Sequence, residues 1–160
     1  MAIGRTRNAK LAVTYSSDCG DTWSKVVLSD LPNNNSGTDA VTLADGRQVV
    51  VFNDFATLPG TPKGVRTPVS IAVSEDDGKT WKNAVVLEDS PISQYSYPSI
   101  IQGKDGKLHC VHFTAPSCVL VIFANLLCPI STRPFLCAIR LFKTDATTNK
   151  KSIVFFMLYH

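Results

Sequence analysis

The chain has 160 residues, of which 44% are hydrophobic and 18% are charged, and its formal net charge is +3. This composition is typical of a globular protein and excludes a disordered chain. Because the charged residues of both signs are interspersed and form no basic run, we do not expect a nucleic-acid-binding surface.

The N-terminal residues lead directly into polar sequence and contain no apolar stretch of the kind found in a secretory signal. The default expectation is a cytoplasmic protein, and the alternative is that the true N-terminus lies upstream. The five cysteines form no C-x-x-C pair, so we expect no zinc site. We also expect no other metal and no cofactor. Their odd number predicts free thiols.

An eight-residue motif occurs twice in the chain. Residues 16–23 and 74–81 share the pattern S-x-D-x-G-x-T-W, and the two copies begin 58 residues apart. Each copy lies between two short apolar runs that we predict to be strands. These runs cover residues 11–15, 26–30, 69–73 and 85–89. Repetition at a fixed period of this length predicts a repeated structural unit.

The shared residues of the motif predict a turn. The aspartate can accept hydrogen bonds from backbone N–H groups two or three residues later, and glycine allows a positive φ. The tryptophan begins the next strand and can bury a large ring. We therefore assign these residues a structural rather than a catalytic role. They are Ser16, Asp18, Gly20, Thr22, Trp23, Ser74, Asp76, Gly78, Thr80 and Trp81.

A second repeated element alternates with the motif. Residues 39–52 and 97–112 each contain two apolar runs joined by an Asp-Gly pair, which predicts a hairpin with a two-residue turn. Combined with the motif, these hairpins give four antiparallel strands for each repeat, as in a propeller blade. No apolar period of 3.6 residues appears before residue 113, so the predicted fold class is all-β.

The eight-residue motif resembles the Asp-box, or BNR repeat, of the sialidases (neuraminidases). The segments 33–43, 53–55, 58–68 and 95–98 are also similar to that family, and the resemblance covers about residues 4–112. It implies part of a six-bladed β-propeller of the sialidase type. One complete four-stranded blade is expected from about residue 36 to residue 89. It would follow the third and fourth strands of one blade and precede the first two strands of another, so the chain is expected to be a piece of a propeller.

Residues 113–160 do not match the family pattern and form a hydrophobic tail that contains three of the five cysteines. A membrane anchor is not expected, because the first apolar run ends at Pro129 after about 13 residues and a spanning helix needs roughly 20. We favour the interpretation that the reading frame runs past a splice junction here, or that the gene model is truncated. Such a tail need not fold with the propeller.

Strand direction divides the predicted loops between two ends of the propeller. The Asp-box turns and the Asp-Gly turns share the lower end, whereas the links between blades and the loop after the second strand share the upper end. In sialidase-like proteins the upper end holds the active site, and an arginine cluster there binds the sugar carboxylate. The resemblance implies that Arg66, Arg5 and Arg7 supply substrate-binding arginines, because a guanidinium meets a carboxylate with two hydrogen bonds.

Retaining sialidases use a tyrosine nucleophile. Tyr97 and Tyr95 precede an inner strand in a position similar to that tyrosine, so the resemblance makes both catalytic candidates, with strand packing as the alternative. Asp39 is the best candidate for the acid or base, and Asp54 is second and a candidate for substrate binding. His109 and His112 should point to opposite faces of one strand, which does not favour a metal site.

The resemblance therefore implies a sialidase-like glycoside hydrolase that acts on a terminal acidic sugar, with a carbohydrate as its partner. We expect this chain to be inactive alone, because the arginines and the nucleophile–base pair come from blades around the whole ring. The alternative is a non-catalytic Asp-box propeller that binds carbohydrate or protein. A third possibility is a truncated product with no independent activity.

Overall fold

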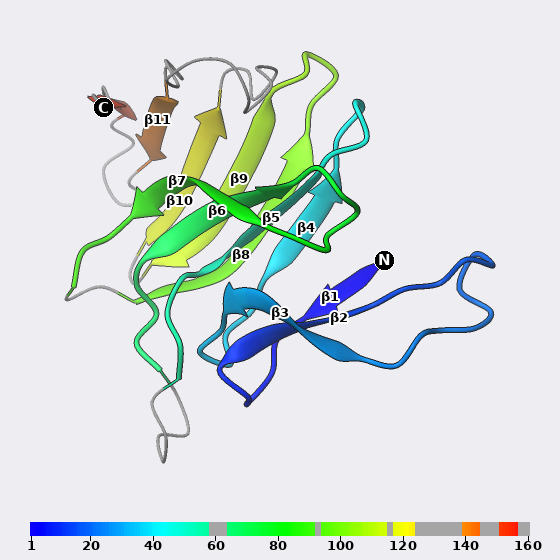
Figure 1. Cartoon of the computed structure of the whole chain (residues 1–160). Helices are drawn as coiled ribbons and strands as arrows, with labels where there is room; N and C mark the ends of the chain where they lie inside the picture. Colours follow the sequence, from blue (N-terminus) through cyan, green and yellow to red (C-terminus); the bar gives the residue numbers. More distant parts are fainter. Residues whose placement is uncertain (58–63, 92–93, 115–116, 124–138, 145–150, 157–160) are drawn as a thin grey trace.

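The computed structural model describes the backbone of residues 1–57, 64–91, 94–114, 117–123, 139–144 and 151–156, and side chains as far as Phe113. Three antiparallel sheets make up this part of the chain (Figure 1). No helix occurs in the described segments, and so none that is long and apolar enough to cross a membrane. The predicted all-β class is confirmed.

The first sheet contains three strands in the order β1 (Ala2–Gly4), β2 (Lys10–Thr14) and β3 (Val27–Pro32). The sequence predicted β2 and β3 but not β1, so the expected start of the chain at the third strand of a blade was wrong. β1 has three residues, which is too few to show a strand period in the sequence. It is an edge strand that pairs with β2 over its whole length.

The second sheet is the complete four-stranded blade. Its strands β4 (Asp39–Thr42), β5 (Gln48–Asn53), β6 (Val69–Ser74) and β7 (Lys82–Glu88) pair in chain order, all antiparallel. An Asp-Gly turn joins β4 to β5, and the second eight-residue motif joins β6 to β7. This is the strand order predicted for one repeat.

The third sheet contains β8 (Tyr95–Gln102), β9 (Leu108–Thr114), β10 (Ser117–Phe123), β11 (Ile139–Thr144) and β12 (Lys151–Phe156). These strands also pair in chain order and are antiparallel. The last three belong to the region expected to be a non-matching tail, and their backbones continue the sheet that β8 and β9 begin. The proposed division of the chain at residues 112 and 113 stays a prediction.

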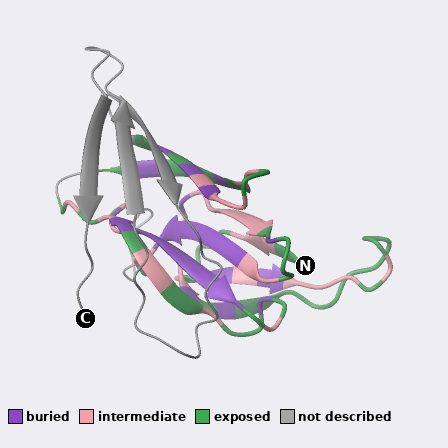
Figure 2. Ribbon diagram, turned by 90° about the horizontal axis from the view of Figure 1, so that it is seen from above, coloured by how far each residue is buried: buried purple, intermediate pink, exposed green. Residues whose placement is uncertain are grey.

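Two apolar clusters join the sheets and place the second sheet between the other two. One cluster combines Val49, Val51 and Ile71 of the second sheet with Ile100 and Leu108 of the third. Because the second sheet is covered on both faces, all six residues of β6 are buried. Figure 2 shows the buried strands in the interior of the molecule.

The other cluster combines Leu11 and Leu31 of the first sheet with Val50, Phe52 and Ala72 of the second. Each sheet thus packs face to face with the next, as blades do in a propeller. The chain forms part of a β-propeller, with one full blade and parts of two neighbours.

Candidate functional site

The two eight-residue motifs fold into the same turn. In the second copy, the Ser74 hydroxyl donates to Oδ1 of Asp76 (2.7 Å) and accepts from the Gly78 N–H (2.8 Å). Oδ1 of Asp76 also accepts from the Thr80 N–H (2.8 Å), and Oδ2 accepts from the Thr80 hydroxyl (2.6 Å). Gly78 has a φ of +78°, which a residue with a side chain rarely adopts.

The first copy repeats these contacts. Oδ1 of Asp18 accepts from the Ser16 hydroxyl (2.7 Å) and from the Thr22 N–H (2.9 Å), and Gly20 has a φ of +100°. In both copies the hydrogen bonds from the threonine hydroxyl lower the pKa of the aspartate most, to about 2. Both carboxylate oxygens of each aspartate accept hydrogen bonds from the turn itself. The aspartates therefore stabilise the turn and are not available for acid–base chemistry.

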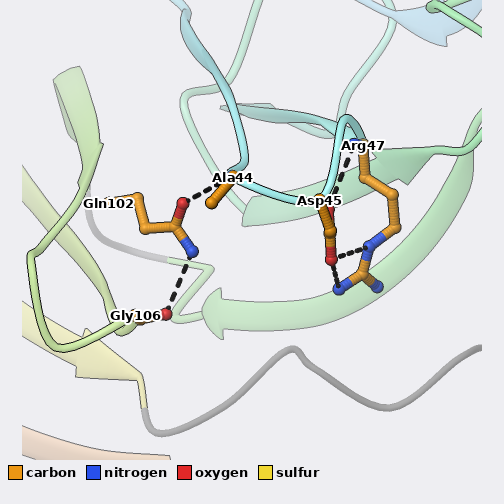
Figure 3. Close-up of polar contacts among 5 residues, drawn as sticks. All are labelled: Ala44, Asp45, Arg47, Gln102 and Gly106. Carbon is orange, nitrogen blue, oxygen red and sulfur yellow. Dashed lines mark hydrogen bonds and ion pairs between the residues drawn. The ribbon is translucent and has the colours of Figure 1, made fainter.

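The lower end of the molecule also carries the Asp-Gly turns of the second and third sheets. Oε1 of Gln102 accepts from the Ala44 N–H in the turn of the neighbouring sheet (2.8 Å), and its Nε2 donates to the Gly106 carbonyl (3.2 Å) (Figure 3). The Arg47 guanidinium binds Asp45 within the same turn (2.7 Å). Of these contacts, the one between Gln102 and Ala44 joins the two sheets, and the others stabilise the individual turns.

A polar rim lies at the upper end, where the links between sheets meet the loop after β5. Oδ1 of Asn33 accepts from the Thr6 N–H (3.1 Å), and the Ser36 hydroxyl lies within hydrogen-bond distance of Oδ1 of both Asn34 and Asn53. Nδ2 of Asn53 then donates to the Tyr95 carbonyl in the third sheet (3.2 Å). The rim therefore connects all three sheets.

Arg66 and Tyr97 lie together at this rim. Nη1 of Arg66 donates to the Ser96 hydroxyl (2.5 Å), and the guanidinium carbon is 5.7 Å from the centroid of the Tyr97 ring. That distance is within the range of a cation–π contact. The Arg66 carbonyl accepts from the Tyr95 N–H (3.0 Å), so the backbone is fixed as well. The site thus presents a positively charged group beside an aromatic ring.

The Tyr97 side chain is 68% exposed and its backbone is unusual. Its φ is +49°, and the register between β8 and β9 shifts between Ser96 and Ser99. A non-glycine residue held at positive φ in a strand is strained, and such strain concentrates at functional sites. The bulge points the Tyr97 ring outward instead of into the core.

Tyr95, the other tyrosine candidate, is only 4% exposed and belongs to the core between the second and third sheets. Its ring makes an edge-on contact with His112, with centroids 5.4 Å apart. A buried phenol cannot meet a sugar without opening the core, so this position favours the packing alternative for Tyr95.

Asp39 and Asp54 both use their carboxylates within the fold. Oδ2 of Asp39 accepts from the Ser99 hydroxyl (2.8 Å) and from the Ile100 N–H (2.9 Å), which ties β4 to β8. Oδ2 of Asp54 accepts from Nδ2 of Asn83 (2.8 Å). Both carboxylates are only partly buried, so either could still meet a ligand, but each has a structural task.

Arg5 and Arg7 are exposed in the segment between β1 and β2. Thr6 lies between them, and its N–H donates to Asn33 of the polar rim. The Asn33 N–H in turn donates to the Ala9 carbonyl (2.8 Å), so two hydrogen bonds attach the segment with both arginines to the polar rim. In the described part of the chain, no group of three or more His, Cys, Asp or Glu residues is arranged to hold a metal ion.

Sequence reasoning missed the buried polar residues that build the rim. Asn33, Asn34, Ser36 and Asn53 are between 0% and 2% exposed, and Ser96 is 8% exposed. A signal was present, because Asn and Ser side chains tend to hydrogen-bond to nearby backbone groups, as Asn33 and Asn34 do with the N–H groups of Asn35 and Ser36. Gly64 is a second missed residue, since a Cβ there would lie 2.6 Å from Cβ of Asn34.

A solved structure of another protein shares the fold of this chain. The chain is similar over 94% of its length to a crystal structure of a protein of unknown function from Dyadobacter fermentans, with a TM-score of 0.53 and 16% identity. This chain spans 52% of that structure's length, and at this identity the likeness concerns the fold alone. No curated protein matches the sequence.

A family model described as a BNR repeat-like domain matches residues 1–110, which includes both Asp-box turns and the polar rim. The match agrees with the repeated turn geometry and with the face-to-face packing of four-stranded units. This chain belongs to the BNR repeat-like domain family.

Proposed function

We propose that this chain supplies part of a sialidase-like glycan-binding site at the polar rim. In this site Arg66 binds the carboxylate of a terminal acidic sugar and Tyr97 contacts the sugar ring. The observation that carries the proposal is the guanidinium of Arg66, which Ser96 holds beside an aromatic ring that is 68% exposed. A guanidinium suits a carboxylate because it offers two parallel charge-assisted hydrogen bonds.

Arg5 and Arg7 extend the same site. They lie on a segment that is bound to the rim through Thr6, and both side chains are exposed. A cluster of positive charge at one end of the molecule attracts an anionic ligand and repels a cationic one. The proposed ligand is therefore an acidic sugar and not a neutral or basic one.

Hydrolysis of the glycosidic bond is the finer part of the proposal. Tyr97 would be the nucleophile, since a neutral phenol approaches an anionic sugar without charge repulsion, and a nearby base would take its proton. Asp39 is the proposed acid or base, although its two hydrogen bonds to β8 must then be kept or replaced. We expect this chain alone to bind the sugar but not to turn it over.

The alternative is a non-catalytic propeller that binds carbohydrate or protein. It is favoured by the structural tasks of the acidic candidates, because Asp39 ties two sheets together and Asp54 binds Asn83. A site with a cation and an aromatic ring but no free carboxylate binds a glycan without cleaving it.

A binding experiment tests the sugar site itself. Binding of a sialoside would be measured by calorimetry for the wild type, Arg66→Ala, Tyr97→Phe and Tyr97→Leu, with the neutral desialylated glycan as control. We expect Arg66→Ala and Tyr97→Leu to weaken binding at least tenfold and Tyr97→Phe to leave it unchanged. Equal affinity for both glycans, or no loss in Arg66→Ala, would remove the proposal.

Turnover is tested with a fluorogenic sialoside on the same variants. Hydrolysis that Tyr97→Phe abolishes while binding persists would support the nucleophile. Binding without turnover, both in this chain and in any longer form that carries it, would favour the non-catalytic alternative.

A further inference from the structure

The link from β3 to β4 lies against both parts of the proposed glycan-binding site. On one side, a Cβ on Gly64 would lie 2.6 Å from Cβ of Asn34, so the loop that carries Arg66 packs directly on the link. On the other side, a Cβ on Gly37 would lie 3.5 Å from the Tyr97 ring. We call the loop with the guanidinium and the bulged strand with the exposed ring the two arms of the site.

Two buried asparagines bind the backbone of these arms. Nδ2 of Asn34 donates to the carbonyl of Val65, the residue before Arg66, at 2.5 Å. Nδ2 of Asn53 donates to the carbonyl of Tyr95, in the strand with the exposed ring, at 3.2 Å. The asparagines are 2% and 0% exposed, respectively. Because each Nδ2 is used by a carbonyl, the Oδ1 of each amide is left to accept from another donor.

Ser36 joins the two asparagines at the centre of the link. Its hydroxyl lies within hydrogen-bond distance of Oδ1 of Asn34 and 2.5 Å from Oδ1 of Asn53, and the residue is 1% exposed. A hydroxyl has a single hydrogen to donate. Oδ1 of Asn34 has a second donor in the Ser36 N–H (3.2 Å), whereas the described residues supply no second donor for Oδ1 of Asn53. The Asn53 amide therefore depends on this hydroxyl.

We propose that Ser36 is a positioning residue of the glycan-binding site. Its hydroxyl fixes the Asn53 amide, which holds the strand with Tyr97, and contacts the Asn34 amide, which holds the loop with Arg66. Because an acidic sugar must meet the guanidinium and the ring together, a small displacement between the arms weakens binding. This inference rests on the proposed function, but the positioning itself can be measured without a sugar.

Two matched variants separate positioning from stability. Ser36→Ala removes the hydroxyl that joins the asparagines. Thr38→Val removes another hydroxyl of the same link, which donates instead to the Val51 carbonyl within the second sheet (2.7 Å). Circular dichroism and urea unfolding show whether each variant is folded and how much stability it loses. If Ser36→Ala does not fold, Ser36→Cys takes its place, because a thiol fills the same space and is a weaker donor.

Fluorine NMR of the full chain labelled with fluorotyrosine reports on the two arms in the absence of sugar. Tyr97→Phe identifies the resonance of Tyr97, and Arg66→Ala shows how far that resonance moves when the guanidinium is removed from the ring. We expect Ser36→Ala to move the resonance toward its position in Arg66→Ala. Thr38→Val should leave it at the wild-type position.

Calorimetry with a sialoside measures the consequence for binding. We expect Ser36→Ala to weaken the affinity about fivefold, a typical size for coupling between connected residues, and Thr38→Val to change it less than about twofold. A purely structural role would give both variants an effect in proportion to their loss of stability.

The two measurements distinguish failure of this inference from failure of the proposed function. If the wild type binds the sialoside no better than the neutral glycan while Ser36→Ala still moves the Tyr97 resonance, the sugar is wrong and the positioning role stands. A folded Ser36→Ala variant with the wild-type resonance would overturn the positioning role. An unchanged affinity beside a moved resonance, or equal effects of Ser36→Ala and Thr38→Val, would overturn it as well.

Discussion

The indole N–H of Trp23 and that of Trp81 each donate to the carbonyl of the glycine three residues earlier, at 2.9 Å and 3.1 Å. The hydrogen bond is the same although Trp23 is half exposed and Trp81 packs against a neighbouring sheet. The turn is therefore built by its own eight residues. Packing against another blade adds to it but does not shape it.

Gly78→Ala should destabilise the fold more than Gly106→Ala. Both glycines have a φ of +78°, so an alanine costs about 1–2 kcal/mol at either place. At Gly106 the new Cβ meets open space, whereas at Gly78 it meets the Met1 side chain and lies 3.3 Å from the Trp81 ring. Urea unfolding of both variants measures the difference. Equal losses would mean that Met1 and Trp81 move aside without cost.

Acid should destabilise the protein through the two Asp-boxes. Asp18 and Asp76 have a folded-state pKa of about 2, against 3.8 for an ordinary aspartate. A carboxyl with a lowered folded pKa stabilises the fold above its unfolded pKa, and this contribution is lost as the pH falls toward the folded value. We therefore expect the thermal midpoint to fall between about pH 4 and pH 2.

The double variant Asp18→Asn and Asp76→Asn is the control for this pH dependence. It should be less stable than wild type at neutral pH. Its thermal midpoint should change less with pH below pH 4, because an amide does not titrate. Asp45 and Asp105 also have a lowered pKa, through Arg47 and Lys107, so some slope will remain. An unchanged slope would show that the Asp-boxes do not carry the acid sensitivity.

Sequence patterns predicted the parts of the fold that are local. The octets and the Asp-Gly pairs specify their own turns, and the period of about 58 residues gives the order of strands in a blade. The polar rim was harder to predict, because its contacts join residues far apart in the chain, such as Asn53 and Tyr95. Motifs and hydrophobic periodicity describe neighbouring residues and do not predict contacts between residues that are distant in the sequence.

The two tyrosines show why side-chain direction was not predictable. Tyr95 and Tyr97 are two residues apart, so strand alternation places them on the same face. The structure buries Tyr95 and exposes Tyr97, because the bulge between Ser96 and Ser99 resets the alternation. A bulge of this kind depends on the partner strand, which the local sequence does not reveal.

Asp39→Ala should destabilise the contact between the second and third sheets more than Ser99→Ala. Loss of the Asp39 carboxylate leaves the N–H of Ile100, a residue that is 2% exposed, without its acceptor, which costs about 1–3 kcal/mol. Ser99→Ala removes only the exposed hydroxyl contact. Urea unfolding measures both. A stability of Asp39→Ala equal to that of wild type would leave catalysis as the better explanation for this residue.

Gly64→Ala should disturb the polar rim, whereas Gly37→Ala should be tolerated. A Cβ at Gly64 would lie 2.6 Å from Cβ of Asn34, which is attached to the backbone and cannot move away cheaply. Overpacking of this kind costs about 1–3 kcal/mol. A Cβ at Gly37 would lie 3.5 Å from the Tyr97 ring, an ordinary contact.

Thermal denaturation compares the two glycine variants with wild type. A larger loss of stability in Gly37→Ala than in Gly64→Ala would contradict this expectation. It would mean that the Tyr97 ring packs more closely on Gly37 than the 3.5 Å measured here. A Gly64→Ala variant as stable as wild type would mean that the loop with Arg66 can shift away from Asn34.

Cys19 and Cys110 should differ strongly in their reaction with a maleimide. Cys110 is 0% exposed, and burial raises the pKa of its thiol to about 12, so almost no thiolate forms at neutral pH. Cys19 is exposed in the first Asp-box turn, and both thiols are free. Mass spectrometry of labelled peptides should find Cys19 modified within minutes and Cys110 modified only in denaturant. Rapid labelling of Cys110 without denaturant would mean that the third sheet separates readily from the second, since its thiol lies in the cluster between them.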